Sequence, residues 1–249
     1  MSEPGRERLA ALLRDVAGGR FPPADGGVTV LPQPSPRDAG VLGFTAHAVV
    51  FADADPDWIR AQLPPGDLGA PLQPPFLSAL CGLTGRTAGS IDMLCFAPGL
   101  PGEPPIALTS IDMGTGAGPA GRPGPRPRPA STAQTRILAP DAPSGHHPRV
   151  ERAFGYRDEV RAWETDGGVV LLGHGVAGRW ETAIEVDPDR RGRGLGRALA
   201  TAARHLVPAG EILWAQVAPA NAASVRAFLA AGFMPVGAEV LLALGPRQP

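Results

Sequence analysis

The sequence predicts an α/β fold built on a mixed (α+β) sheet, and three features of its second half carry this prediction. Strand-like and helix-like segments alternate from residue 180 to residue 244. The segment EILWAQVA is almost continuously apolar, which is typical of a strand covered on both faces. A glycine-rich turn, RGRGLG at residues 191–196, leads from a strand into a helix with an amphipathic apolar stripe.

The individual elements of this half follow from local patterns. The turns Asp166-Gly167-Gly168 and Ala177-Gly178-Arg179 separate apolar runs, which indicates three consecutive strands. Gly232 is placed to end a helix. We therefore expect strands at 135–140, 159–165, 168–176, 180–186, 211–218 and 239–244, and helices at 149–160, after 187 and over 219–233.

The first half has less regular signals. A helical stripe near the N-terminus contains Leu9, Leu12, Leu13 and Val16. Asp55 is placed to cap a short helix that begins with Pro56. The expected order beyond the first helix is strand, helix, helix, strand, strand, at 44–51, after 55, 74–83, 90–97 and 104–111.

A segment rich in glycine and proline separates the two halves. Ten of the sixteen residues from Gly114 to Pro129 are Gly or Pro, which disfavours both backbone hydrogen-bond ladders and apolar burial. We expect residues 1–112 to form an N-terminal accessory or degenerate domain, 113–131 a linker and 132–249 the second domain.

Composition excludes several classes of protein. The chain has 249 residues and a formal net charge of -1, so it lacks the basic surface of a nucleic-acid-binding protein. Its two cysteines are too few for a disulfide scaffold, and we expect both to be buried thiols. No apolar run reaches the ~18 residues of a membrane span, and the charged N-terminus does not resemble a signal peptide. We expect a cytoplasmic protein without nucleic-acid or membrane partners and without a metal, while its oligomeric state stays open.

The turn at 191–196 has the chemistry of an anion-binding loop. A helix N-terminus offers unpaired N–H groups and a partial positive charge, and glycines let a phosphate approach the backbone. Arg190, Arg191, Arg193 and Arg197 add positive charge beside it. The dinucleotide pattern G-x-G-x-x-G fails from Gly192 and from Gly194, and a Walker loop needs a lysine, which the chain lacks.

The remaining diphosphate is coenzyme A, and here the sequence resembles the GCN5-related N-acetyltransferase (GNAT) superfamily. The family pattern V-x-P followed by R/Q-x-x-G-x-G/A matches Val186-Asp187-Pro188 and Arg191 to Gly196. A second pattern, N-x-x-A/S-x-x-x-Y/F-x-x-x-G-F, matches Asn221, Ser224, Phe228, Gly232 and Phe233, and Asn221 is the only asparagine in the chain. The resemblance covers roughly residues 135–245.

The resemblance implies a GNAT acyl-CoA N-acyltransferase fold in the C-terminal half, with the strands at 180–186 and 212–217 splayed apart. It implies acetyl-CoA as cosubstrate, its pantetheine arm beside Val186 and its diphosphate on the loop amides from Arg193 to Arg197. The implied cofactor-binding residues are Val186, Arg191, Arg193, Gly194, Leu195, Gly196, Arg197, Asn221, Ser224 and Phe228.

Two departures leave the catalytic residues open. Many family members have a tyrosine where Phe228 stands, and a phenylalanine cannot protonate the leaving thiolate; Tyr156 is the only phenol in the chain. Trp180 stands at the position where one well-known branch of the family has a glutamate. Glu181 and Glu185 on the same strand are therefore the candidate general bases, and His174 is a further candidate.

Two function hypotheses follow. The first is an N-acetyltransferase that moves an acetyl group to a primary amine of a small molecule or peptide. The second, favoured by Phe228 and the uncertain base, is a catalytically silent module that binds coenzyme A or a partner. The N-terminal half is either a degenerate second copy of the fold or an accessory domain that shapes the acceptor site.

Overall fold

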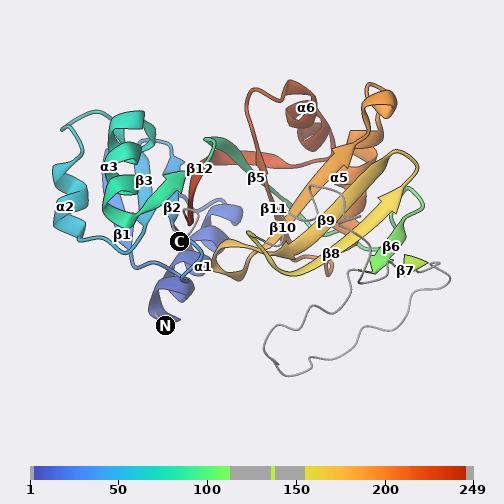
Figure 1. Cartoon of the computed structure of the whole chain (residues 1–249), viewed down its shortest axis with the longest axis horizontal. Helices are drawn as coiled ribbons and strands as arrows, with labels where there is room; N and C mark the ends of the chain where they lie inside the picture. Colours follow the sequence, from blue (N-terminus) through green and yellow to red (C-terminus); the bar gives the residue numbers. More distant parts are fainter. Residues whose placement is uncertain (1–2, 113–135, 138–154, 245–249) are drawn as a thin grey trace, which may run out of the picture.

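The described residues form one mixed sheet with helices on its faces (Figure 1). The computed structural model describes residues 3–112, 136–137 and 155–244. The linker predicted at 113–131 therefore lies outside the described residues. The α/β fold class with a mixed sheet is confirmed, since parallel and antiparallel pairs occur in the same sheet.

The helices and strands have the following bounds. The helices are α1 (Glu3–Ala17), α2 (Pro56–Ala61), α3 (Pro74–Thr84), α5 (Leu195–His205) and α6 (Ala222–Ala230). The strands of the first half are β1 (Val28–Leu31), β2 (Gly40–Phe44), β3 (His47–Phe51), β4 (Arg86–Ala88), β5 (Asp92–Pro98) and β6 (Thr109–Asp112). Those of the second half are β7 (Arg136–Ile137), β8 (Asp158–Thr165), β9 (Gly168–His174), β10 (Trp180–Val186), β11 (Ile212–Val217) and β12 (Met234–Leu244).

Strand order shows that the two halves share one sheet. The order is β1-β3-β2-β12-β5-β11-β10-β9-β8-β6-β7, with β4 paired to β12. Strand β5 of the first half is antiparallel to β11 on one side and to β12 on the other. In Figure 1, β5 and β12 run between the group of β1 to β3 with α2 and α3 and the group that carries α5 and α6. The N-terminal half is thus built into the sheet beside the glycine-rich loop.

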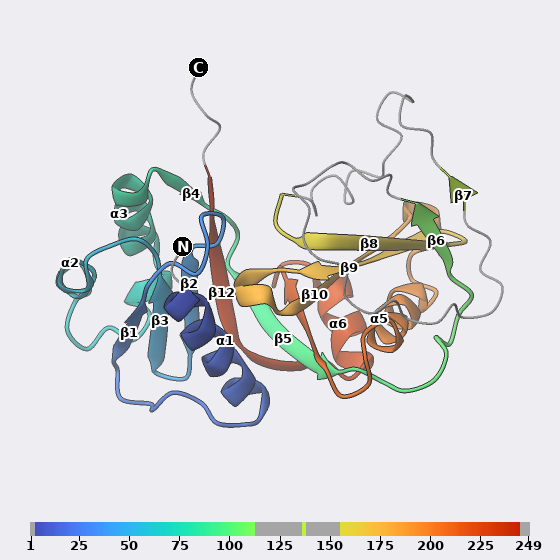
Figure 2. The same cartoon turned by 90° about the horizontal axis from the view of Figure 1, so that it is seen from below.

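The N-terminal helix is packed on this shared sheet. Leu9, Leu13 and Val16 of α1 are buried in a cluster with Leu94 of β5 and Trp214 of β11. The stripe that predicted the helix is therefore the face that contacts strands of both halves. Figure 2 shows α1 beside the strands of the first half, at the side of β12 away from α5 and α6.

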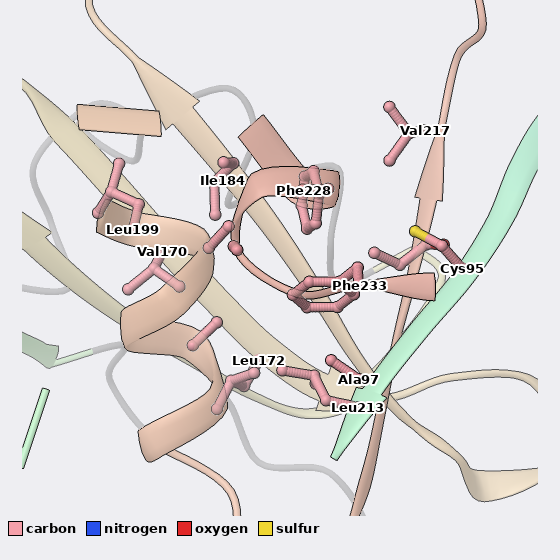
Figure 3. Close-up of a cluster of buried hydrophobic side chains, with 14 of the residues drawn as sticks. Cys95, Ala97, Val170, Leu172, Ile184, Leu199, Leu213, Val217, Phe228 and Phe233 are labelled. Atoms are coloured by element: carbon pink, nitrogen blue, oxygen red, sulfur yellow. The ribbon is translucent and has the colours of Figure 1, made fainter. Parts of the chain in front are cut away.

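A second core lies beneath α5 and α6, which contact each other (Figure 3). Leu199 of α5 and Phe228 of α6 pack with Val170, Leu172 and other side chains of the sheet. Phe228 and Phe233 meet edge to face, with ring centroids 4.9 Å apart. This core fixes the two helices whose N-termini border the glycine-rich loop and the second motif.

Most predicted elements are confirmed, and four expectations are corrected. Residues 158–160 begin strand β8 instead of ending a helix, because they pair with β9; residues 149–154 lie outside the description. The single strand expected at 44–51 is interrupted by a hairpin turn. Phe44 ends β2 and His47 begins β3, because Ala46, with a φ of 51°, turns the chain between them. The strand expected at 104–111 is shorter, since β6 covers Thr109–Asp112. Cys95 is buried as expected, but Cys81 is only half-buried.

Among the described residues, no helix is long and apolar enough to cross a membrane.

Shortening one buried side chain of α1 should show how much the packing of this helix contributes to stability. Leu9 is fully buried, so Leu9→Ala should lower the free energy of unfolding by about 2–5 kcal/mol through lost apolar contacts and a residual cavity. Chemical denaturation measures the loss, with Glu7→Ala on the exposed face of the same helix as control. Equal stability of the two variants would show that α1 is not packed as described.

Candidate active site

Two parallel strands that diverge form the centre of the candidate site. Strands β10 and β11 pair only at Trp180 with Leu213 and at Glu181 with Trp214. Beyond these pairs β10 continues to Val186 along β9, and β11 continues to Val217 along β5, but the two are no longer joined. The splayed strands that the resemblance implied are therefore present, and each has backbone groups that face the opening between them.

The glycine-rich loop stands at the end of β10. Gly192 and Gly194 have φ values of 74° and 84°, a region that glycine enters at little cost. Gly194 is the N-cap of α5 and makes no side-chain cap, so the first N–H groups of α5 have no partner of that kind. A Cβ at either glycine would have no atom within 4 Å, so the space above the loop is open. The loop thus has the open backbone geometry that an anion needs.

The arginines beside this loop are in different situations. Arg190 is paired with Asp166 at 2.6 Å, and Arg191 donates from Nε to the carbonyl of Val186 at 3.1 Å. Arg193 and Arg197 are exposed and have no ion pair with another described residue. The last two are therefore the cations available to a diphosphate.

A crevice of about 530 Å³ runs between this loop and α6, and we call it the loop crevice. Asn221 caps α6 there, because its Oδ1 accepts from the N–H of Ser224 at 3.1 Å. The cap that the sequence allowed is therefore formed. The residues that line the crevice are Ile184, Glu185, Val186, Arg190, Arg191, Gly192, Gly194, Leu195, Gly196, Arg197, Asn221, Ala223, Ser224, Arg226, Ala227 and Ala230.

A second cavity of about 390 Å³ adjoins it, and we call it the carboxylate cavity. It shares Ile184, Asn221 and Ser224 with the loop crevice, so the two spaces meet beside the diverging strands. Its other lining residues are Gly89, Ser90, Asp92, Tyr156, Arg157, Glu181, Thr182, Ala183, Gln216, Val217, Ala218, Phe228, Glu239 and Leu241. Strand β5 of the first half and β12 thus contribute to the same cavity as β10 and β11.

A buried ion network forms one wall of the carboxylate cavity. Arg179 donates from Nε to Glu181 Oε1 at 2.8 Å and from Nη2 to Glu239 Oε2 at 2.7 Å. Arg157 donates from Nε to the other oxygen of Glu181 at 3.1 Å. Gly175 makes room for this network, because a Cβ there would overlap the carboxylate of Glu181. The network joins β10 to β12 at Glu181, the last residue of β10 that pairs with β11.

The two buried glutamates have opposite pKa shifts. Burial alone raises both, but Arg179 and Arg157 together bring the pKa of Glu181 below its usual value. Glu239 bonds only Arg179 among the arginines, and burial with the neighbouring charge of Glu181 keeps its pKa raised. Burial also raises the pKa of Asp92, although Ser90 Oγ donates to it at 2.8 Å. Glu181 is therefore the weakest proton acceptor of the three carboxylates.

The structure separates the catalytic candidates proposed from sequence. Glu181 lines the carboxylate cavity and Glu185 lines the loop crevice. Tyr156 lines the carboxylate cavity, 40 % exposed, and Phe228 lines it from the buried core. His174 stacks on Trp180, with ring centroids 3.9 Å apart, and lines neither space.

Sequence reasoning missed Asp92, Glu239, Gln216 and Arg179. The one signal in the sequence was that each charged residue among them lies within an apolar strand-like run or directly after one. Their proximity depends on the pairing of β12 with β5, which no local pattern reveals. No group of metal-ligating side chains occurs among the residues that the structure describes.

The family comparison agrees with this geometry. Residues 147–233 match the acetyltransferase (GNAT) family, a range that contains both the glycine-rich loop and the Asn221 motif. This segment of the chain is similar to the GNAT family. Among curated proteins, none matches the sequence.

Two solved structures show a distant likeness to this chain. One is a GCN5-related N-acetyltransferase from Kribbella flavida, with 16% identity, a TM-score of 0.35 and coverage of 68% of this chain and 64% of that one. The other is a tandem GNAT protein from the clavulanic acid biosynthesis pathway, with 18% identity, a TM-score of 0.36 and coverage of 75% and 63%. The chain spans less than two thirds of either structure.

The buried network gives a stability prediction. Arg179→Ala would leave Glu181 and Glu239 buried without their shared cation, so the free energy of unfolding should fall by about 3–5 kcal/mol at pH 7. The loss should shrink as the pH falls, because the stranded carboxyls can then protonate. Chemical denaturation at pH 7 and pH 5 tests this, with the exposed Arg60→Ala as control, where we expect a change below about 1 kcal/mol. An equally small change for Arg179→Ala would contradict the network.

Proposed function

We propose that this protein is an N-acetyltransferase that moves the acetyl group of acetyl-CoA to a primary amine. The observation that carries the proposal is the meeting of the loop crevice and the carboxylate cavity beside the diverging strands. One space offers amides and arginines to a diphosphate, and the other offers carboxylates to an amine. A thioester at the junction would be within reach of both.

The residues of the loop crevice fit the diphosphate of coenzyme A. The first-turn amides of α5, together with Arg197, supply donors and positive charge at one place in the crevice. Arg193, which the sequence also predicted to bind the cofactor, is exposed beside the loop and does not line the crevice. Val186, Asn221 and Ser224 line the path from this loop to the junction. The unpaired backbone of β10 beyond Glu181 offers hydrogen-bond groups to an extended pantetheine arm.

The reaction requires two proton transfers and one exchange of bonds. The ammonium form of the acceptor loses a proton, and its nitrogen lone pair attacks the thioester carbon. The resulting oxyanion collapses, the C–S bond breaks and the electron pair leaves on sulfur. The nitrogen loses its second proton and the thiolate gains one, so the products are the N-acetyl amide, coenzyme A and one net proton.

The positions of the carboxylates bear on which group accepts the first proton. Glu181 faces the cavity that the amine would enter, whereas Glu185 borders the loop where the diphosphate would lie. We therefore favour Glu181 over Glu185 on position. Its two arginine contacts lower its basicity, so Glu239, in the same cavity and with a raised pKa, is the stronger proton acceptor. Tyr156, the only phenol of the chain, lines the same cavity and is our candidate for protonating the thiolate.

Turnover with amines tests the proposed activity. We expect coenzyme A to be released from acetyl-CoA only when a primary amine is present, at a modest rate because Phe228 cannot act as an acid. Thiol release is followed colorimetrically over a panel of amines, with the isosteric alcohols as controls. Thermal stabilisation by acetyl-CoA without amine-dependent release would identify the silent binding module instead.

A matched pair of variants at Gly194 tests whether the glycine-rich loop binds the diphosphate. Asp and Asn impose the same strain at Gly194, where φ is 84°, but only Asp adds negative charge and competes for the amides of α5. Gly194→Asp should bind acetyl-CoA about tenfold more weakly than Gly194→Asn by calorimetry. Equal affinities for the two folded variants would exclude the diphosphate from this loop.

A further inference from the structure

The segment that leads into β8 supplies two side chains to the carboxylate cavity. Tyr156 and Arg157 line this cavity, but neither belongs to a strand, because β8 begins only at Asp158. The ladder between β8 and β9 shifts register between Asp158 and Arg161, and Glu159 in this interval has a φ of 50°. Such a bulge interrupts the regular pairing of a strand. The sheet therefore holds this end of β8 less firmly than the rest of the strand.

An arginine of the N-terminal half contacts this end of β8. Nη1 of Arg37 donates to Oδ1 of Asp158 at 2.9 Å, although 121 positions separate the two residues in the sequence. The side chain of Asp158 is 74% exposed and that of Arg37 is 24% exposed. An exposed ion pair usually contributes little, because ordering two flexible side chains costs conformational entropy. The contact can therefore hold β8 only if Arg37 is already fixed by other neighbours.

The surroundings of Arg37 meet this condition. Its Nε donates to Oδ1 of the buried Asp38 at 2.8 Å. The buried Arg86 fixes the backbone of the same loop, since its guanidinium donates to the carbonyls of Pro36 and Arg37 at 2.6 and 2.8 Å. The same guanidinium donates to the carbonyl of Leu242 in β12 at 2.9 Å. Arg37 is thus pre-organised on the sheet, so the pair needs the ordering of only one further side chain.

The two cavity residues of the segment differ in how they are held. Nε of Arg157 donates to Oε2 of Glu181 at 3.1 Å, and the arginine stem lies close over Gly173 of β9, where a Cβ would come within 2.9 Å of it. Tyr156 is 40% exposed and has no hydrogen bond to another described residue. The position of Tyr156 therefore depends on the residues that follow it, and Asp158 is the one among them that the N-terminal half holds.

We propose that Arg37 is a positioning residue of the carboxylate cavity: through its ion pair with Asp158 it holds Tyr156 at the cavity. The part that Tyr156 plays in turnover rests on the proposed acetyltransferase function, whereas its positioning by Arg37 does not. The N-terminal half thus acts on the site in a second way besides strand β5, because its arginine orders the only phenol of the chain.

The competing interpretation is that Arg37 serves only its own loop. Its bond to Asp38 lies entirely within the N-terminal half, and losing that bond would destabilise the loop without any effect on Tyr156. The two interpretations differ in whether Asp158 transmits the effect of Arg37 to the cavity. A variant of Asp158 separates them, because it leaves the bond between Arg37 and Asp38 intact.

The single tyrosine of the chain gives a direct readout of this segment. Incorporation of a ring-fluorinated tyrosine labels the full chain at Tyr156 alone, and fluorine NMR then reports its surroundings. We expect Asp158→Ala to move the resonance toward its position in the denatured protein and to narrow it. The control is Asp57→Ala, which removes another exposed aspartate paired with an arginine and should match the wild type. A resonance unchanged in Asp158→Ala, or equally shifted in Asp57→Ala, would overturn the proposal.

A double-mutant cycle shows whether Arg37 acts through Asp158. Arg37→Ala and Asp158→Ala should shift the Tyr156 resonance equally, and the double variant should show the same shift as either one, because both changes remove one contact. Shifts that add in the double variant would reveal two independent effects and would contradict the proposal. If Arg37→Ala does not fold, the exposed Asp158→Ala with its control decides alone.

Kinetics connect the position of Tyr156 to the reaction. In Asp158→Ala, kcat/KM for the amine should fall about fivefold through misplacement of the segment. The Kd of acetyl-CoA should stay unchanged, because residues 156–158 do not line the loop crevice. An equal loss of acetyl-CoA affinity would indicate a general structural defect and count against the positioning role. If no amine releases coenzyme A from the wild type, the proposed function fails, and the fluorine resonance still decides the role of Arg37.

Discussion

The separation of β10 from β11 is the constraint on which the rest of the site depends. A parallel pair that ends after Glu181 and Trp214 leaves two strand segments that cannot satisfy each other's backbone groups. Each segment is held from its outer side instead, β10 by β9 and β11 by β5. The sheet can therefore stay intact on both sides of an opening, and the opening joins the two spaces that we assign to the acyl donor and the acceptor.

The two faces of this opening have different chemistry because side chains alternate along a strand. Ala215 of β11 joins the apolar core under α5 and α6, while the next residue, Gln216, lines the carboxylate cavity. The α5 side combines apolar packing with helix N-termini, as a diphosphate site needs. The polar side concentrates buried carboxylates and arginines. Strand β11 thus presents an apolar side chain to the core and a polar one to the cavity that we assign to the acceptor.

The buried ion network connects this site to the N-terminal half. Arg179 bridges Glu181 on β10 and Glu239 on β12, and β12 in turn pairs with β2 and β5. A buried network of this kind is a weak source of net stability, because desolvation offsets most of its Coulomb energy. Its specific geometry instead fixes where the carboxylates stand. Whether the N-terminal half descends from a second copy of the fold or not, its strand β5 is part of the wall.

The sequence by itself determined the features that depend on neighbouring residues. The loop Arg191–Gly196, the cap at Asn221 and the amphipathic stripes of α1 and α5 follow from backbone freedom, capping and periodicity, all of which act within a few residues. Only the tertiary structure decided which strands are neighbours. Asp92 and Glu239 face each other because β5 lies between β11 and β12, and Arg179 meets a carboxylate 60 residues away. Strand order is set by the burial of whole faces of the sheet and not by any local pattern, so the charged wall of the cavity could not be predicted from its residues alone.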